Sequence, residues 1–212
     1  MGFVKKQSSQ VQVIAEDERT APRDFEGLCG ELNKEDHQAR RWAARDLAQF
    51  PTNASEVLVA RLRIEEHPSV RTAILSTLAH LGDSVAISGL MECLHSDEAS
   101  LRNEAIEVLK EIPDEVAHVI EKLLSDADSD VRIFAVNILE SLRHQNVEKW
   151  LMTVIENDTH VNVCATALDL LSEVGTIASL SALQKLKARF SGEPYITFSA
   201  DLAIKRIQEG EK

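Results

Sequence analysis

Aromatic residues are scarce in this chain. Phe, Trp and Tyr make up 4% of the 212 residues, whereas 44% of the residues are hydrophobic, and most of those are Leu, Ala, Val and Ile. Aromatic side chains supply much of the bulk of large cores, whereas small aliphatic side chains suit thin layers of helix packed on helix. We therefore expect an all-α protein without a bulky central core.

The chain also has only three cysteines and no long apolar run. Cys29, Cys93 and Cys164 lie far apart and lack zinc-ligand spacing. Unpaired cysteines of this kind usually pack as small hydrophobic residues and are typical of a reducing compartment. No apolar run approaches the roughly 18 residues of a membrane span, and no apolar segment of a secretory signal follows Lys5 and Lys6. We expect a cytoplasmic protein that neither enters a membrane nor binds metal.

Motifs of catalysis and of phosphate binding are missing. The eight glycines are isolated from one another, so the chain has no glycine-rich phosphate loop, and no Gly-x-Ser-x-Gly nucleophile motif occurs. The formal net charge of −12 would repel a phosphate backbone. We expect no catalytic residue, no cofactor and no nucleic-acid partner.

What the sequence does contain is a repeat of about thirty residues. It begins at an apolar anchor residue, and the positions four, eight and eleven residues later are again small or apolar in all six copies. Successive anchors are 30 to 33 residues apart. The anchors are Ala39, Val70, Leu101, Val131, Val163 and Ile196. A period of this length is typical of a solenoid.

Each repeat reads as two helices joined by a short turn. The anchor opens the first helix, and a second apolar series marks the second helix at Leu58, Leu90, Ile120, Leu151 and Leu183. We expect an α-α superhelix of about five helical hairpins plus terminal capping helices. It would form a single repeat domain over residues 23–209, preceded by a flexible tail over residues 1–22.

Helix ends and the two capping helices give further expectations. Asp24 is placed to cap the first helix, and Gly82 and Gly175 follow the last apolar residue of their helices, where a left-handed glycine often ends a helix. A lone helix over residues 193–208 would close the far end, with Tyr195 and Phe198 adding aromatic bulk.

The repeats resemble HEAT repeats, and more closely the short variety of phycobilisome lyase subunits (PBS lyase HEAT-like repeats) and bacterial scaffolds. The resemblance covers about residues 24–208. It rests on an acidic residue shortly before an apolar–Arg pair, as in Asp36 with Ala39-Arg40 and Asp128 with Val131-Arg132. The fifth and sixth repeats replace the Arg by Cys164 and Thr197. HEAT-like di-iron hydroxylases carry His-Glu dipeptides, and none of the seven histidines here precedes Glu.

An arginine ladder is the most regular polar feature, formed by Arg40, Arg71, Arg102 and Arg132. It could be a basic strip for an acidic ligand. It could instead hold the repeats together by bonding carboxylates and free carbonyls at their junctions, and we favour this structural interpretation.

The second helices commonly line the concave side of such solenoids, so their exposed positions are the candidate binding surface. The candidate protein-binding residues are Met91, His118, Lys149, Trp150 and Met152. Met and Trp side chains suit an adaptable groove for a protein segment, although Trp150 could equally pack between repeats. We expect a non-catalytic interaction module that binds a partner protein, for example a bacterial regulatory or assembly protein. The alternative, on resemblance alone, is a subunit of a bilin (chromophore) lyase.

Overall fold

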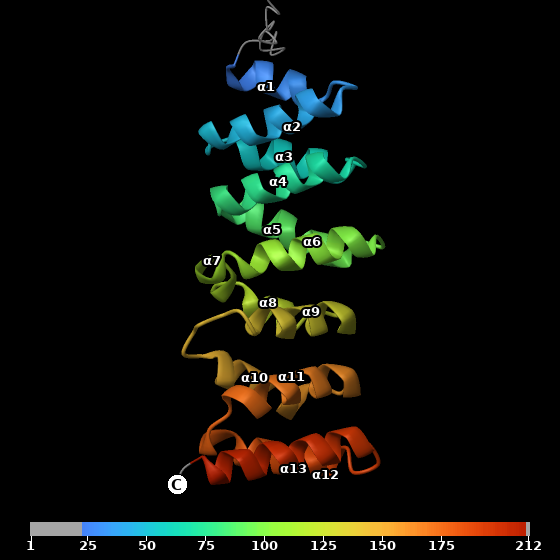
Figure 1. Cartoon of the computed structure of the whole chain (residues 1–212), viewed down its shortest axis with the longest axis vertical. Helices are drawn as coiled ribbons and strands as arrows, with labels where there is room; N and C mark the ends of the chain where they lie inside the picture. The colour runs from blue at the N-terminus through green and yellow to red at the C-terminus, as the bar shows by residue number, and fades with distance from the viewer. Residues whose placement is uncertain (1–22, 211–212) are drawn as a thin grey trace, which may run out of the picture.

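A computed structural model describes residues 23–210, and the expected tail over residues 1–22 lies outside this range. The described residues form thirteen α-helices with three short 3₁₀ turns and contain no strand. Figure 1 shows the helices stacked along one long axis, from α1 (Phe25–Leu32) at the top to α13 (Pro194–Glu209) at the bottom. The expected all-α solenoid is confirmed.

Five hairpins form the stack between α1 and α13. Each first helix contacts the first helix of the next hairpin, and each second helix contacts the first helix that follows it. The hairpins pair α2 (His37–Asp46) with α3 (Ala54–Leu62), α4 (Pro68–Leu81) with α5 (Ser84–Glu92), α6 (Ala99–Lys110) with α7 (Pro113–Ala117) and α8 (Ile120–Leu124), α9 (Ser129–Leu139) with α10 (Val147–Asn157), and α11 (Val161–Val174) with α12 (Leu180–Arg189).

The repeat register is confirmed by burial. All six residues four places after an anchor are completely buried, namely Ala43, Ile74, Ala105, Ala135, Ala167 and Ala200. The five aligned residues of the second helices are also completely buried. Short helices like these are marginal alone in water, so this shared layer of small and branched side chains is what holds the solenoid together.

Two of the three helix-end residues singled out in the sequence behave as expected. The Asp24 side chain caps α1 by accepting a hydrogen bond from the Gly27 amide at 2.8 Å. Gly82 ends α4 in the expected left-handed conformation, with φ of 61°. Gly175 is extended instead, with φ of −66°. Glycine is required there for space, because an added Cβ would lie 2.5 Å from the Leu171 carbonyl oxygen.

Two further expectations need correction. The second helix of the third hairpin is broken into α7 and α8, yet Val116 and Ile120 stay completely buried on either side of the break. Helix α13 lies at the far end of the stack as expected, but Tyr195 and Phe198 add no bulk to the core, since both side chains are exposed. No helix within residues 23–210 is long and apolar enough to span a membrane.

Candidate functional site

Arg40 joins the first two repeat junctions. Its guanidinium donates two hydrogen bonds of 2.8 Å to the Glu65 carboxylate, just before α4. It also donates to the carbonyl oxygens of Lys34 at 2.9 Å and Glu35 at 2.6 Å, just before α2. Arg40 and Glu65 are both buried. This guanidinium is therefore engaged inside the protein.

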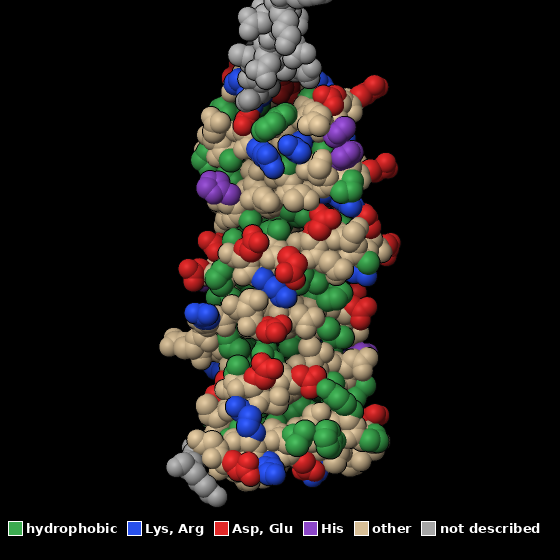
Figure 2. All heavy atoms as spheres, in the orientation of Figure 1, with side chains coloured by type: hydrophobic (Ala, Val, Ile, Leu, Met, Phe, Trp, Pro, Cys, Tyr) green, Lys and Arg blue, Asp and Glu red, His purple; other side chains and the backbone are tan. Residues whose placement is uncertain are grey.

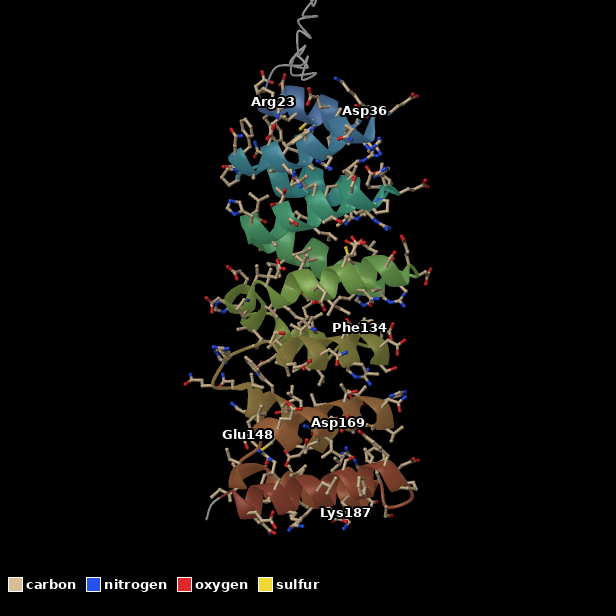
Figure 3. All side chains as sticks on the ribbon, viewed as in Figure 1. Arg23, Asp36, Phe134, Glu148, Asp169 and Lys187 are labelled. Atoms are coloured by element: carbon tan, nitrogen blue, oxygen red, sulfur yellow. The ribbon has the colours of Figure 1, made fainter. Side chains whose placement is uncertain are left out.

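The other three arginines of the ladder bond at later junctions. Arg71 pairs with Glu98. Arg102 donates a hydrogen bond of 2.7 Å to the Ser96 carbonyl oxygen. Its guanidinium also lies over the ring of Phe134, which Figure 3 labels on α9. Arg132 bonds the Asp158 carboxylate at 2.6 and 3.0 Å. These contacts agree with the structural interpretation of the ladder and leave no continuous basic strip for a ligand.

Two of the three acidic partners of the ladder occupy a register that sequence reasoning missed, whereas Glu98, the partner of Arg71, stands three residues before its anchor. Glu65 and Asp158 stand five residues before the next anchor, whereas Asp36 and Asp128, three residues before their anchors, cap α2 and α9. An acidic residue 25 or 26 positions after a ladder arginine is the sequence signal that could have identified these ion pairs. Both acidic positions therefore supply cross-links to the ladder, and the position three residues before the anchor also supplies the caps of α2 and α9.

At the fifth junction, Cys164 occupies the ladder position and a guanidinium arrives from another helix. Arg189, the last residue of α12, donates to the carbonyl oxygens of Ile155 at 2.7 Å, Glu156 at 2.6 Å and Asp158 at 2.9 Å, and it lies 3.4 Å from the Cys164 sulfur. Burial raises the pKa of the Cys164 thiol, so the thiol stays neutral and donates to Asp158. Arg189 takes over the carbonyl contacts that ladder arginines make elsewhere.

A pocket of about 500 Å³ opens where α8 and α9 meet α10. It contains two of the predicted binding residues, Lys149 and Trp150, together with the ladder residue Arg132. Its lining is Glu121, Leu124, Ser125, Asp126, Arg132, Lys149, Trp150, Thr153, Val154, Asn157, Asp158 and Thr159. The pocket therefore combines apolar surface with charges of both signs.

Trp150 forms a wall of this pocket and also packs the repeats together. Its ring stacks on His144 with centroids 4.9 Å apart, and its indole nitrogen donates to Glu121 at 2.9 Å. Only 6% of the residue is exposed. Both interpretations of Trp150 thus have support, because its ring is structural while its edge lines the pocket.

The charges in the pocket differ in how firmly they are fixed. Burial alone would raise the pKa of the Asp158 carboxyl, but the hydrogen bonds from Arg132 hold this pKa below its ordinary value. Lys149 is exposed on α10 and forms no ion pair within residues 23–210. The Lys149 ammonium group is therefore a charge in the lining that an incoming acidic group can use.

The structure does not bring the other three predicted binding residues into this pocket. Met91 is buried in α5, with 8% of the residue exposed. His118 is exposed at the break between α7 and α8, and Met152 is half-buried against the core. Only Lys149 and Trp150 form one site.

Reactive or metal-binding clusters are not found among the described residues. No three His, Cys, Asp or Glu side chains within residues 23–210 lie close enough to hold a metal ion. The three cysteines are free, and burial raises the pKa of the Cys93 thiol to about 11. Cys93 is thus a neutral, buried side chain.

Solved structures share this fold at low sequence identity. An archaeal HEAT-like repeats protein from Thermococcus onnurineus NA1 is 18% identical over 86% of each chain, with a TM-score of 0.46. Cex1p is 16% identical over 81% of this chain and 39% of its own length, with a TM-score of 0.50. The complex of CpcE and CpcF of phycocyanin lyase from Nostoc sp. PCC7120 is 16% identical over 94% of this chain and 100% of that chain, with a TM-score of 0.39.

Family membership follows from the sequence itself. No curated protein matches the chain. The family model for HEAT repeats matches residues 25–110 and 116–195. These two segments cover most of the described helices. The chain belongs to the HEAT repeat family.

Proposed function

We propose that this protein is a non-catalytic interaction module that binds a segment of another protein in the pocket between α8, α9 and α10. The observation that carries the proposal is the placement of Lys149 beside the apolar wall formed by Leu124, Trp150 and Val154. A concave site with apolar walls and a few oriented polar groups is the usual form of a binding site.

The lining indicates the chemistry of the bound segment. Lys149 would attract a carboxylate, and the adjacent apolar wall would accept an aliphatic or aromatic side chain. Glu121 is held by Trp150 and Asp158 is held by Arg132. The preferred ligand is thus a peptide segment with an acidic residue next to an apolar anchor.

A surface variant tests this function better than truncation of Trp150, whose ring supports the fold. Lys149→Glu with Thr153→Arg reverses one charge and fills the pocket while changing only exposed residues of α10. Lys122→Glu, an exposed lysine of α8 outside the pocket, is the matched control. Affinity capture from the native cell, read by mass spectrometry, compares these two variants with the unaltered protein.

We expect a partner that is captured by the unaltered protein and by Lys122→Glu, and that is lost with the pocket variant. The purified partner should bind at least tenfold more weakly to the pocket variant, since the charge contact is reversed and the added arginine blocks access to the apolar wall. Equal binding by all three proteins would show that the pocket is not the site. Absence of any partner specific to the unaltered protein would contradict the module itself.

The bilin-lyase alternative makes a separate, optical prediction. A chromophore-handling subunit would change the visible absorbance of phycocyanobilin on mixing, whereas a protein-binding module would not. This titration uses the same purified protein and distinguishes the two functions directly.

A further inference from the structure

The last helix, α13, carries an exposed apolar stripe. Tyr195, Phe198 and Leu202 are 52%, 64% and 51% exposed. Their spacings of three and four residues place them on one face of the helix. Figure 2 shows hydrophobic side chains gathered over α13 near the C-terminal end of the stack. Exposed aromatic residues in a row are unusual on a soluble surface and mark interaction sites.

The stripe is specific to this helix. The same three register positions in earlier repeats hold polar side chains, such as Ser69, Thr72 and Ser76 in α4 and Ser100, Asn103 and Glu107 in α6. From α2 to α11 the exceptions are Ile133 and Ala165, which are half-buried. Ordinary solenoid packing therefore does not require apolar residues at these positions.

The stripe is also separate from the surface that a seventh repeat would cover. In the inner helices, the residue five places after the anchor is buried by the next repeat, as at Leu75, Val136 and Leu168. In α13 this residue is Asp201, which is exposed and pairs with Lys187 at 2.6 Å. The end of the stack is thus closed by charged groups, and the apolar stripe lies to one side of them.

Charge distribution favours a second copy of this chain as the occupant. Residues 23–176 contain 14 lysines and arginines against 28 aspartates and glutamates, whereas residues 177–210 contain five against three. Two copies that meet through their last hairpins keep their strongly acidic segments apart, whereas a contact between the two acidic segments would bring like charges together.

Charges along α13 complement one another in an antiparallel pair. Exposed Glu193 precedes the helix, and Lys205, whose side chain is 70% exposed, lies near its end. Antiparallel packing about Phe198 would place Glu193 of each copy near Lys205 of the other. Near the stripe, the Tyr195 hydroxyl donates to Asp169 at 2.6 Å, and Figure 3 labels Asp169 on the adjacent helix α11. This bond orients the tyrosine ring.

We infer that α13 is a dimerisation surface on which α13 of a second copy packs antiparallel, with Phe198 at the twofold axis. The contact is isologous, so it forms a closed dimer and not a filament. The stripe offers roughly 300 Å² of apolar surface per copy, judged from the area that aromatic side chains bury. This is small for a stable dimer, and dissociation constants in the micromolar range are expected.

Sedimentation of the full chain over a concentration series tests this inference. We expect a monomer–dimer equilibrium that the double variant Phe198→Ser/Leu202→Ser weakens at least tenfold, with an unchanged helical circular dichroism spectrum because both side chains are exposed. Ile64→Ser removes an equally exposed side chain, 67% accessible, far along the stack and should leave the equilibrium unaltered. A monomer at all concentrations up to about 200 μM, well above the expected micromolar range, would overturn the inference. Equal effects of Phe198→Ser/Leu202→Ser and of Ile64→Ser on the equilibrium would also overturn it.

A charge exchange tests the antiparallel arrangement. Glu193→Lys and Lys205→Glu should each weaken self-association, because each places like charges opposite one another in both contacts. An equimolar mixture of the two variants should restore dimers, since each of the two contacts then joins a lysine of one variant to a glutamate of the other. A mixture that dimerises no better than either variant alone would refute the antiparallel pairing.

Discussion

Glu65 places a negative charge in the interior of the junction before α4. Its side chain is 1% exposed, a position in which an unpaired carboxylate would be very costly. Burial acts to raise the pKa of Glu65. Hydrogen bonds outweigh this effect and lower the pKa from 4.5 to about 2, and they come from Arg40, the His67 amide and Arg61. The carboxylate is thus more acidic in the folded than in the unfolded chain.

Stability should therefore depend on pH through Glu65. A carboxyl with a depressed folded-state pKa stabilises the fold fully above pH 4.5, and this contribution is lost as the pH falls from 4.5 to about 2. The pKa difference corresponds to at most about 3 kcal/mol. We predict that Glu65→Gln lowers the free energy of unfolding by about this amount at pH 7, and that its difference from the unaltered protein shrinks between pH 4.5 and 2.

Urea unfolding at a series of pH values measures this difference. Glu66→Gln is the matched control, because Glu66 is the exposed neighbour in sequence, and it should change stability little at any pH. A gap between Glu65→Gln and the unaltered protein that stays constant down to pH 2 would show that the junction does not depend on the charge of this carboxylate.

At the scale of elements, the packing of α5 on α3 depends on a missing side chain. A Cβ added to Gly89 would lie 2.3 Å from one methyl group of Val59 and 3.1 Å from the other. Since Val59 is β-branched, its rotation in a helix is restricted and cannot readily relieve this contact. Val59 is buried at this contact. One glycine therefore allows α3 and α5 to pack closely.

We predict that Gly89→Ala destabilises the protein by about 1–3 kcal/mol, the usual cost of overpacking. Ala is otherwise the better helix former, by about 1 kcal/mol. Gly30→Ala in α1 should show this ordinary gain, because nothing lies within 4 Å of the added Cβ. Thermal unfolding of both variants provides the comparison, and recovery in Gly89→Ala/Val59→Ala would identify the clash. Stabilisation by both single substitutions would mean that the two helices are not in close contact.

At the scale of the whole molecule, periodicity made the architecture predictable. Six copies of one pattern identify the buried positions independently of one another, so single departures such as Cys164 do not obscure the register. The site was less predictable, because it depends on how closely neighbouring helices approach. The same register position is buried at Met91 and exposed at Glu121, so the repeat pattern alone does not decide it. The exposure of Phe198 follows from the side of α13 on which it lies. Arg189 restores a junction from α12, at a position that holds no arginine in the other second helices.

Stability in a solenoid depends on having a neighbour on each side. Leu109 in central α6 is completely buried, whereas Ile204, at the same register position in α13, is half-buried, and within residues 23–210 no helix packs on the far side of α13. We predict that Leu109→Ala lowers the free energy of unfolding by about 2–5 kcal/mol, and that Ile204→Ala costs about half as much. Urea unfolding measures both. A loss below about 1 kcal/mol for Leu109→Ala, or an equal loss at both positions, would contradict stabilisation by stacking, because the central residue alone has repeats on both sides.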